Sequence, residues 1–246
     1  MVNFKTYFAL ALTVFTVIIF TPLGILAFFF SLIGFRKIMS LCIYKIGQVW
    51  GKVIIATTGC SVTVIGTEHI PAQGGICFVS NHVGLFDIVL AISYTGRPFG
   101  FIAKKELMFL PFINVWISIL GGLFIDRKNI RKAIDTINKG IKRLQSGNSM
   151  LIFPEGTRNK GEGLLPFKAG SIKLATNSLV PIVPIAITGT YEVYERHNRV
   201  CAVPLGIVFC PPIITAEMDA DVRRHQLVDM VKASIEQALL DSKKQD

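Results

Sequence analysis

A histidine and an aspartate stand five positions apart in the heptad Asn-His-Val-Gly-Leu-Phe-Asp at residues 81–87. The apolar run Ile76 to Val79 comes directly before the heptad and predicts a buried strand. A neutral imidazole can accept a proton from a hydroxyl group near pH 7, because its reference pKa is about 6.5. A neighbouring carboxylate can fix the tautomer of the ring and stabilise the imidazolium that forms. His82 and Asp87 are therefore candidates for a general base and its orienting partner.

The spacing of the two residues restricts how they can meet. Five residues of one α-helix span about 500° of rotation, so both side chains could not point to the same side of a continuous helix. They can meet only if His82 lies in a loop and Asp87 at or just inside the next helix, with Gly84 easing the turn. A structural role is the alternative, in which Asp87 is the N-cap of that helix and Asn81 orders a turn. The heptad alone leaves both roles open.

Three further stretches lie at predicted strand ends, where α/β folds usually collect ligands. They are Gly121-Gly122-Leu123-Phe124-Ile125-Asp126-Arg127, Phe153-Pro154-Glu155-Gly156-Thr157-Arg158 and Val180-Pro181-Ile182-Val183-Pro184. In the second stretch, Gly156 permits close backbone approach and Arg158 offers a planar fork that suits phosphate. Lys104 and Lys105 could add cations to the same rim. The structural alternatives are a plain turn at the glycine pair and an edge strand at the prolines.

Beyond residue 60, short β-rich runs alternate with helical patterns. This alternation predicts one α/β domain, with a single mixed sheet flanked by helices. The predicted strands are Val62–Ile65, Ile76–Ser80, Phe99–Ala103, Leu123–Asp126, Met150–Phe153, Ile182–Ile187 and Gly206–Cys210. The predicted helices are Phe86–Tyr94, Phe112–Leu120, Arg131–Gln145, Ser171–Asn177 and Val222–Leu240.

The N-terminal part of the chain is apolar enough to enter a membrane. Residues 6–35 contain no Asp, Glu, Lys or Arg, a run longer than the ~20 residues that cross a bilayer. Residues 21–24, Thr-Pro-Leu-Gly, should kink or break it, which leaves a kinked span or a segment dipping into one leaflet. Residues 36–58 predict an amphipathic helix that lies at the lipid headgroups or packs on the rest of the protein. We expect membrane-anchoring helices over residues 1–58 and a catalytic domain over 59–246.

Two faces are expected on this amphipathic helix. Lys45 and Lys52 share the polar side, whereas Val49 and Val53 share the apolar one. The basic residues that follow the apolar run are Arg36, Lys37, Lys45 and Lys52. If the run spans the bilayer, they favour a cytoplasmic location for the rest of the chain.

The net charge of +10 favours an anionic partner. Nucleic acid is not expected, because no zinc-finger spacing, RNP-type motif or basic heptad region is present. Anionic lipid or an acidic carrier explains the charge better. The five cysteines form no CxxC pair and the four histidines no HxxxH pair, so reduced thiols and no metal site are expected. A Walker loop, a dinucleotide fingerprint and a GxSxG elbow are also missing from the sequence.

In this order and spacing, the four segments resemble the signature blocks of the glycerolipid acyltransferases, most closely the 1-acylglycerol-3-phosphate (lysophosphatidate) acyltransferases. The resemblance covers residues 61–215 and implies a glycerol-phosphate-acyltransferase-like fold. It implies that His82 is the general base and Asp87 its orienting partner. The residues implied for the glycerophosphate site are Glu155, Gly156, Thr157 and Arg158, with Arg127 and Lys105 as further phosphate contacts. Residues 180–184 would line the acyl or donor side.

The implied reaction moves an acyl group from an acyl carrier protein or coenzyme A thioester to the sn-2 hydroxyl of 1-acylglycerol 3-phosphate. The product is phosphatidic acid for phospholipid synthesis, and neither a metal nor another cofactor is needed. The implied partners are lysophosphatidic acid and the thioester carrier. With the apolar run and the basic residues after it, we expect the protein at the cell membrane with its catalytic domain on the cytoplasmic side. One departure stands out, because the family often places Gln-Ser directly after the histidine. Here Val83-Gly84 stand there, so any hydrogen bond from that pair to the substrate is lost.

Three alternative functions follow from the same residues. The first is an acyltransferase for another lysolipid acceptor, such as a lysophospholipid or an amino-acid-linked lipid. The second is a thioesterase or lysophospholipase in which Ser80 or Cys77 forms an acyl-enzyme, although the missing nucleophile elbow argues against it. The third is a basic lipid-binding protein without activity, against which the intact set of candidate site residues argues.

Overall fold

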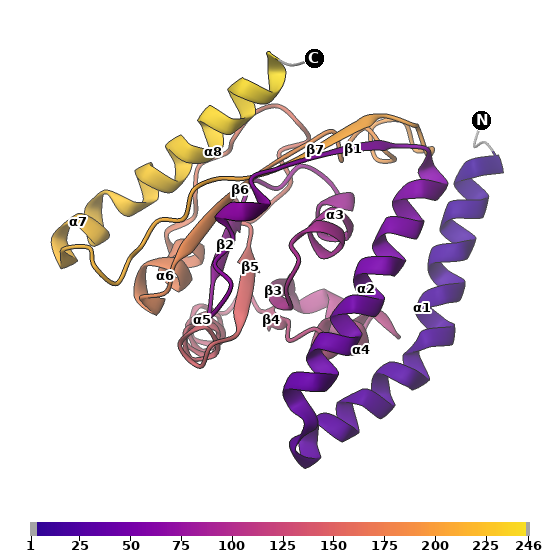
Figure 1. Cartoon of the computed structure of the whole chain (residues 1–246), viewed down its shortest axis with the longest axis horizontal. Coiled ribbons are helices and arrows are strands. Elements are labelled where there is room, and N and C mark those ends of the chain that lie inside the picture. Colours follow the sequence, from indigo (N-terminus) through magenta and orange to yellow (C-terminus); the bar gives the residue numbers. More distant parts are fainter. Residues whose placement is uncertain (1–3, 245–246) are drawn as a thin grey trace.

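A seven-stranded mixed sheet forms the centre of the protein (Figure 1). The computed structural model describes residues 4–244, apart from the side chains at positions 31, 32, 36 and 37. The strands are β1 (Ser61–Ile65), β2 (Cys77–Ser80), β3 (Phe99–Lys104), β4 (Leu123–Ile125), β5 (Ser149–Ile152), β6 (Ile182–Thr188) and β7 (Pro204–Phe209). Their order is β1-β7-β6-β2-β5-β3-β4, and all neighbours are parallel except β6 and β7. All seven predicted strands and the single mixed sheet are confirmed.

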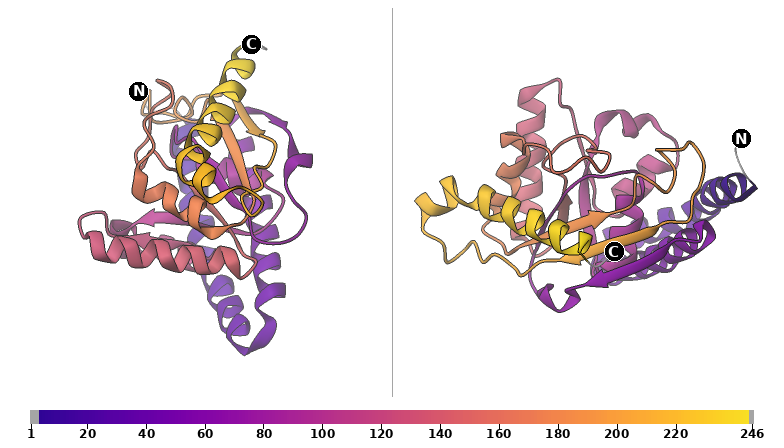
Figure 2. Two further views of the ribbon diagram at one scale, coloured as in Figure 1. Left: turned by 90° about the vertical axis from the view of Figure 1, so that its left-hand side faces the viewer. Right: turned by 90° about the horizontal axis from the view of Figure 1, so that it is seen from above.

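Helices cover both faces of this sheet, because its central strands are apolar on both sides. Along β2, the side chain of Phe78 belongs to one hydrophobic core, and those of Cys77 and Val79 belong to the other. Such alternation follows from the two-residue period of a strand. The helices are α1 (Phe4–Phe30), α2 (Arg36–Thr58), α3 (Phe86–Tyr94), α4 (Ile113–Ile119), α5 (Ile130–Gln145), α6 (Ala169–Ser178), α7 (Ala220–His225) and α8 (Leu227–Lys243). In Figures 1 and 2, the pair α1–α2 and the helix α8 lie on opposite sides of the sheet.

The helix predicted over 222–240 is two helices in the structure. The side chain of Asp219 caps α7 by accepting from the backbone N–H groups of Asp221 and Val222. The chain then breaks at Gln226, where φ is −110°. The break sets the direction of α8, whose fully buried side chains Leu227, Val231 and Ile235 face the sheet.

The N-terminal run folds into a helical hairpin. The helix α1 passes through Pro22 without interruption, and the chain instead reverses at η1 (Ser31–Phe35), where Gly34 has a φ of 106°. Residues 21–24, where a kink or a break was predicted, therefore do not break the helix, and the chain reverses about ten residues later. The hydroxyl of Thr21 donates to the carbonyl of Val17 at 2.6 Å, and the indole Nε1 of Trp116 donates to the same carbonyl at 3.2 Å. The bond from Trp116 holds α1 against α4 beside the proline.

The side of α2 that packs on the domain is not the predicted apolar side. Val49 and Val53, which were predicted to share the apolar side, are 65% and 48% exposed. The buried apolar side chains are instead Ile43, Tyr44, Ile54 and Ile55. The reason is the close approach of α3, since a Cβ added at Gly51 would lie 2.3 Å from Ser93 Oγ. The helix α2 therefore packs on the domain and still exposes an apolar stripe.

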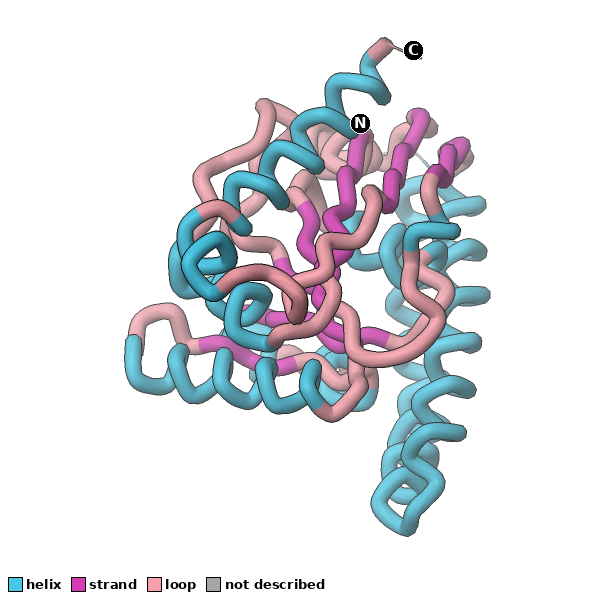
Figure 3. Tube along the Cα trace, turned by 60° about the vertical axis from the view of Figure 1, so that its left-hand side comes forward, coloured by secondary structure: helices cyan, strands magenta, loops and turns pink. Residues whose placement is uncertain are grey.

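Two helices in the described part of the chain, Phe4–Phe30 and Ile38–Thr58, are long and apolar enough to cross a membrane. In Figure 3 the end of the hairpin that contains η1 projects beyond the rest of the protein. The three phenylalanines before this turn, Phe28, Phe29 and Phe30, are all exposed. Exposed aromatic and aliphatic side chains at a projecting tip indicate association with a membrane.

Candidate active site

The predicted site residues gather at one edge of the sheet. The strands β2, β3, β4, β5 and β6 are parallel to their neighbours within this group, so their carboxyl ends meet at that edge. The loops that follow these five strands carry, in chain order, His82, Lys105, Arg127, the segment Glu155 to Arg158, and Thr190. Ligand sites of α/β sheets usually form at such edges.

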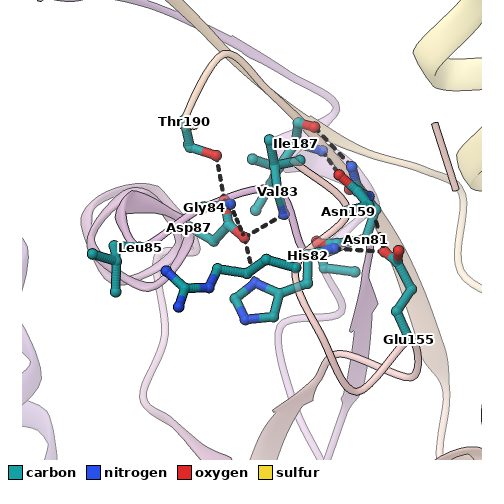
Figure 4. Close-up of polar contacts among 12 residues, drawn as sticks. Asn81, His82, Val83, Gly84, Leu85, Asp87, Glu155, Asn159, Ile187 and Thr190 are labelled. Carbon is teal, nitrogen blue, oxygen red and sulfur yellow. Dashed lines mark hydrogen bonds and ion pairs between the residues drawn. The ribbon is translucent and has the colours of Figure 1, made fainter. Parts of the chain in front are cut away.

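His82 and Asp87 are in contact, as their spacing predicted. His82 lies in the loop after β2, Asp87 lies in the first turn of α3, and His82 Nδ1 is 2.6 Å from Asp87 Oδ2. The Asp87 carboxylate is fully buried and also accepts from the backbone N–H groups of Val83 and Gly84, at 2.7 and 3.1 Å, and from the hydroxyl of Thr190 (Figure 4). Asp87 thus orders the loop as well as the imidazole. It is not the N-cap of the helix, as the structural alternative predicted, because α3 begins at Phe86 and Leu85 is at the N-cap position.

The surroundings of His82 leave one ring nitrogen available for chemistry. A carboxylate can only accept, so the bond to Asp87 places a hydrogen on Nδ1 and the lone pair on Nε2. The imidazole stacks on the ring of Phe153, with centroids 4.2 Å apart. The His82 side chain is 23% exposed, whereas that of Asp87 is buried. The imidazole of His82 is therefore accessible at the surface of the site, and the carboxylate that holds it is shielded from solvent.

Glu155 lies beside the backbone of His82. Its carboxylate accepts from the backbone N–H of His82 at 2.7 Å, from Asn159 Nδ2 at 3.1 Å and from the backbone N–H of Leu165 at 3.0 Å (Figure 4). The backbone N–H of Asn159 donates in turn to the carbonyl of His82 at 2.7 Å. Burial raises the pKa of Glu155, and the three N–H donors oppose that rise. Glu155 and Asn159 thus hold both ends of the residue that carries the imidazole.

Replacing Glu155 by glutamine should destabilise the protein and lower kcat while leaving the acceptor KM nearly unchanged. An amide group presents N–H to one of the three donors, and an unsatisfied buried group costs about 1–3 kcal/mol. Thermal unfolding and steady-state kinetics would measure both effects. A raised acceptor KM with an unchanged melting temperature would instead make Glu155 a substrate ligand.

The other predicted residues join neighbouring loops in pairs. Lys105 Nζ lies 2.8 Å from Asp126 Oδ2, a bond that raises the pKa of the lysine and lowers that of the aspartate. The Arg127 guanidinium donates to the carbonyl of Gly156, a residue whose φ is 68°. Arg158 forms an ion pair with Glu195, and both Thr157 and Arg158 are exposed. The guanidinium of Arg158 is therefore an exposed cation beside the loop that carries His82.

The block over residues 180–184 lies elsewhere. It leads into the amino-terminal end of β6, where Ile182 pairs with Cys77 at the start of β2. This is the edge of the sheet opposite to the His82 loop, and Val180, Ile182 and Val183 are buried. The expectation that this block lines the acyl or donor side is therefore wrong for the site at the carboxyl edge, because these side chains build the core.

Several residues of the site were not singled out from the sequence. The Asn81 side chain, predicted only to order a turn, ties the end of β2 to β6 through two 2.8 Å bonds with the backbone of Ile187. Thr190 and Glu195, which bond to Asp87 and Arg158, lie more than a hundred and nearly forty residues from those partners. Asn159 alone had a usable signal, since it directly follows the segment that ends at Arg158.

The structure places both candidate nucleophiles of the hydrolase alternative out of reach. Ser80 and Cys77 are fully buried in β2, and the Ser80 hydroxyl donates to the carbonyl of Asn81 at 3.0 Å. Burial also raises the pKa of the Cys77 thiol, which opposes formation of a thiolate. Among the residues described, no group of three or more His, Cys, Asp or Glu could hold a metal ion.

Fold and site together define an α/β enzyme with a histidine and a carboxylate at the carboxyl edge of its sheet, and with a membrane-associated helical hairpin packed on the same domain. The family described as Acyltransferase matches residues 61–188. A 1-acyl-sn-glycerol-3-phosphate acyltransferase of Borreliella burgdorferi is 31% identical over 74% of this chain and 68% of its own length. The protein of that name from Salmonella typhimurium is 32% identical over 70% of each chain. The chain belongs to the acyltransferase family.

The chain covers less than two thirds of the length of some other relatives. The 1-acyl-sn-glycerol-3-phosphate acyltransferase of Cocos nucifera is 32% identical over 80% of this chain, which covers 64% of that protein. The crystal structure of a 1-acyl-sn-glycerophosphate acyltransferase from Thermotoga maritima has a TM-score of 0.81 and 24% identity, covering 97% of this chain and 96% of its own. That likeness confirms the fold, including the N-terminal hairpin.

Proposed function

We propose that the protein transfers an acyl group from a thioester to the sn-2 hydroxyl of 1-acylglycerol 3-phosphate and so forms phosphatidic acid for phospholipid synthesis. The observation that carries this proposal is the His82–Asp87 contact at the carboxyl edge of the sheet, with the exposed guanidinium of Arg158 on a loop bonded to the same histidine. The names of the relatives support the same acceptor.

The histidine would act as a general base. His82 Nε2 takes the proton of the acceptor hydroxyl while the oxygen attacks the thioester carbonyl carbon. The C–O bond forms, the C–S bond breaks, and the proton passes from His82 to the leaving sulfur. Asp87 holds Nδ1–H and stabilises the imidazolium. General-base catalysis of this kind contributes about 10²–10⁴-fold. The direct transfer needs no covalent acyl-enzyme, no metal and no further cofactor.

Recognition of the phosphate would fall to the exposed cations at the same edge. Arg158 presents a planar fork, and Lys105 and Arg127 stand at the ends of the two neighbouring strands β3 and β4. Holding the phosphate fixes the hydroxyl against the imidazole, so binding energy is converted into orientation. In this proposal Gly156 and Thr157 shape the loop, and Glu155 positions His82 rather than touching the substrate.

Replacing Arg158 by glutamine is expected to raise the KM for 1-acylglycerol 3-phosphate about 10- to 100-fold. This range corresponds to the loss of one charge-assisted hydrogen bond of about 1.5–3 kcal/mol. Arg196, whose guanidinium pairs with Glu192 on the surface, supplies the matched control, and Arg196→Gln should leave this KM unchanged. An Arg158→Gln enzyme with the wild-type KM would remove Arg158 from the phosphate site.

We further propose that the hairpin enters one leaflet rather than spanning the bilayer. The domain contacts α1 near its start, where Thr6 Oγ1 accepts from the backbone N–H of Val200 at 2.7 Å. It contacts α1 again at Thr21, whose hydroxyl lies 3.1 Å from Trp116 Nε1. Only about ten residues of α1 remain beyond that contact, and they reach about 15 Å, half the hydrocarbon thickness of about 30 Å.

On this arrangement the basic residues Lys45 and Lys52 and the active site face the cytoplasm, where acyl thioesters are found. The side chains of Arg36 and Lys37, which entered the same prediction, lie outside the described residues. A cysteine introduced at Ile33, an exposed residue of the turn η1, should stay protected from a membrane-impermeant thiol reagent added on the far side. Labelling from that side would show a span.

The acceptor can be tested directly with membranes that contain the protein. 1-Acylglycerol 3-phosphate, 1-acylglycerol and lysophosphatidylcholine would each be supplied with acyl-coenzyme A or with acyl carrier protein thioester. We expect turnover of the acceptor with a free phosphate monoester, and the two thioesters would identify the donor. Equal rates with all three acceptors would contradict the proposed phosphate recognition.

A further inference from the structure

Glu195 forms an ion pair with the guanidinium of Arg158, the group that the proposed function assigns to the substrate phosphate. One carboxylate oxygen of Glu195 is paired with Arg158 Nη1, and the other accepts from the backbone N–H of Leu85 at 2.7 Å. The Glu195 side chain is only 14% exposed, and that of Arg158 is 40% exposed. A carboxylate from the segment after β6 therefore joins the loop after β2 to the loop after β5.

This carboxylate lies over Gly84, where the sequence departs from the pair that often follows the histidine. A Cβ at Gly84 would lie 2.6 Å from Glu195 Oε2 and 2.9 Å from the backbone nitrogen of Tyr191. A serine at position 84 could not coexist with Glu195 in its observed place. The glycine and the glutamate thus form one local arrangement beside the imidazole loop.

The neighbouring charges do not compete for Glu195. Glu192, on the same segment, pairs with Arg196 and lies 3.6 Å from His197 Nε2. Arg196 and His197 are therefore both engaged by a different carboxylate. Within the described residues, the Glu195 carboxylate bonds to the guanidinium of Arg158 and to the backbone N–H of Leu85.

We propose that Glu195 is a specificity-determining residue, which holds Arg158 in the free enzyme and yields it to the phosphate of the acceptor. The inference rests on the proposed role of Arg158. A phosphate monoester carries a charge of about −1.5 to −2 near pH 7, against −1 for the carboxylate, so it can displace Glu195. Acceptors with a weaker anionic group, or none, cannot. Displacement also frees the Leu85 N–H to donate to a phosphate oxygen.

The test is the variant Glu195→Gln, which removes the charge but keeps an oxygen for the Leu85 N–H. Without the competing carboxylate, the KM for 1-acylglycerol 3-phosphate should fall by about three- to fivefold, the range expected for an ion pair worth up to about 1 kcal/mol. The inhibition constant of inorganic phosphate should fall by the same factor. A role limited to holding the loop would lower the melting temperature and would not tighten phosphate binding.

Matched variants separate this inference from the proposed function. Glu192→Gln should change neither constant, and Glu195→Gln should give no gain in an Arg158→Gln background. If Arg158→Gln raises the KM but Glu195→Gln leaves it unchanged or raises it, the displacement is refuted while the phosphate site stands. If Arg158→Gln has no effect on the KM, the phosphate assignment itself is wrong. If Glu195→Gln folds poorly, Glu195→Ala can replace it. A lower inhibition constant of inorganic phosphate in that variant would support the displacement of Glu195, and an unchanged or higher constant would refute it.

Discussion

Replacing His82 by alanine is expected to lower kcat for phosphatidate formation by about 10²–10⁴-fold, with little change in the KM of the acceptor. Alanine removes the imidazole that is proposed to accept the proton, and general-base catalysis contributes a factor of this size. The cations proposed to hold the phosphate stay in place, so binding of the acceptor should persist. Steady-state rates with both substrates varied would give the two constants separately.

The control for this variant is a second histidine, on the surface. His225 lies on α7 with an exposed side chain, and His225→Ala should keep the wild-type kcat. A melting temperature close to that of the wild type would confirm that His82→Ala is folded. If folded His82→Ala retained kcat within a few-fold, the imidazole would not be the base.

Replacing Asp87 by asparagine should lower both kcat and stability. The buried carboxylate accepts from His82 Nδ1, from two backbone N–H groups and from the Thr190 hydroxyl. An amide has one accepting oxygen, so its N–H₂ group must face at least one of these donors, at a cost of about 1–3 kcal/mol. The imidazole also loses the partner that fixes its tautomer, so kcat should fall by about 10²-fold or more.

Thr190→Val separates the two effects of Asp87→Asn. This variant removes a single donor from the carboxylate and leaves the contact with the imidazole, so it should cost about 1 kcal/mol of stability and little of kcat. Calorimetry and the acyl-transfer assay would measure the two losses in both variants. Wild-type kcat in a folded Asp87→Asn enzyme would contradict the orienting role.

The sequence predicted the features that depend on local pattern. Short β-rich runs bounded by turns located all seven strands. The signal is strongest for β2, β5 and β6, which are buried along almost their whole length and are therefore almost continuously apolar. The five-residue spacing of His82 and Asp87 required one loop residue and one helix residue, and the structure has that arrangement. The carboxyl edge of the sheet then follows from parallel pairing, which brings separate loops together.

Features that depend on partners distant in the sequence were not predicted. Thr190 and Glu195 meet Asp87 and Arg158 only because β6 lies beside β2 in the folded sheet. Nothing near these residues signals that pairing. Similarly, the outward direction of Val49 on α2 is set by α3, which packs against the glycine side of the helix. A hydrophobic pattern cannot distinguish a face that meets lipid from one that meets the core.

The proline-containing block at residues 180–184 also shows that a local sequence pattern does not reveal the direction of a strand in the sheet. Its position at a strand end was evident from the sequence, but the end at which it lies depends on strand direction within the sheet. Glu155 was placed at the correct edge, yet its side chain turns under the His82 loop instead of toward the exposed cations. Location in the fold was therefore predicted better than the direction of each side chain.

Direct transfer by a general base is tested most simply by the stoichiometry of the wild-type enzyme. An acyl thioester would be incubated with the protein, with and without 1-acylglycerol 3-phosphate, and free thiol, phosphatidate and free fatty acid would be measured together. We expect one thiol for each phosphatidate and no enzyme-dependent thiol release without acceptor. Thiol and fatty acid released without acceptor, or an acyl label bound covalently to the protein, would contradict it.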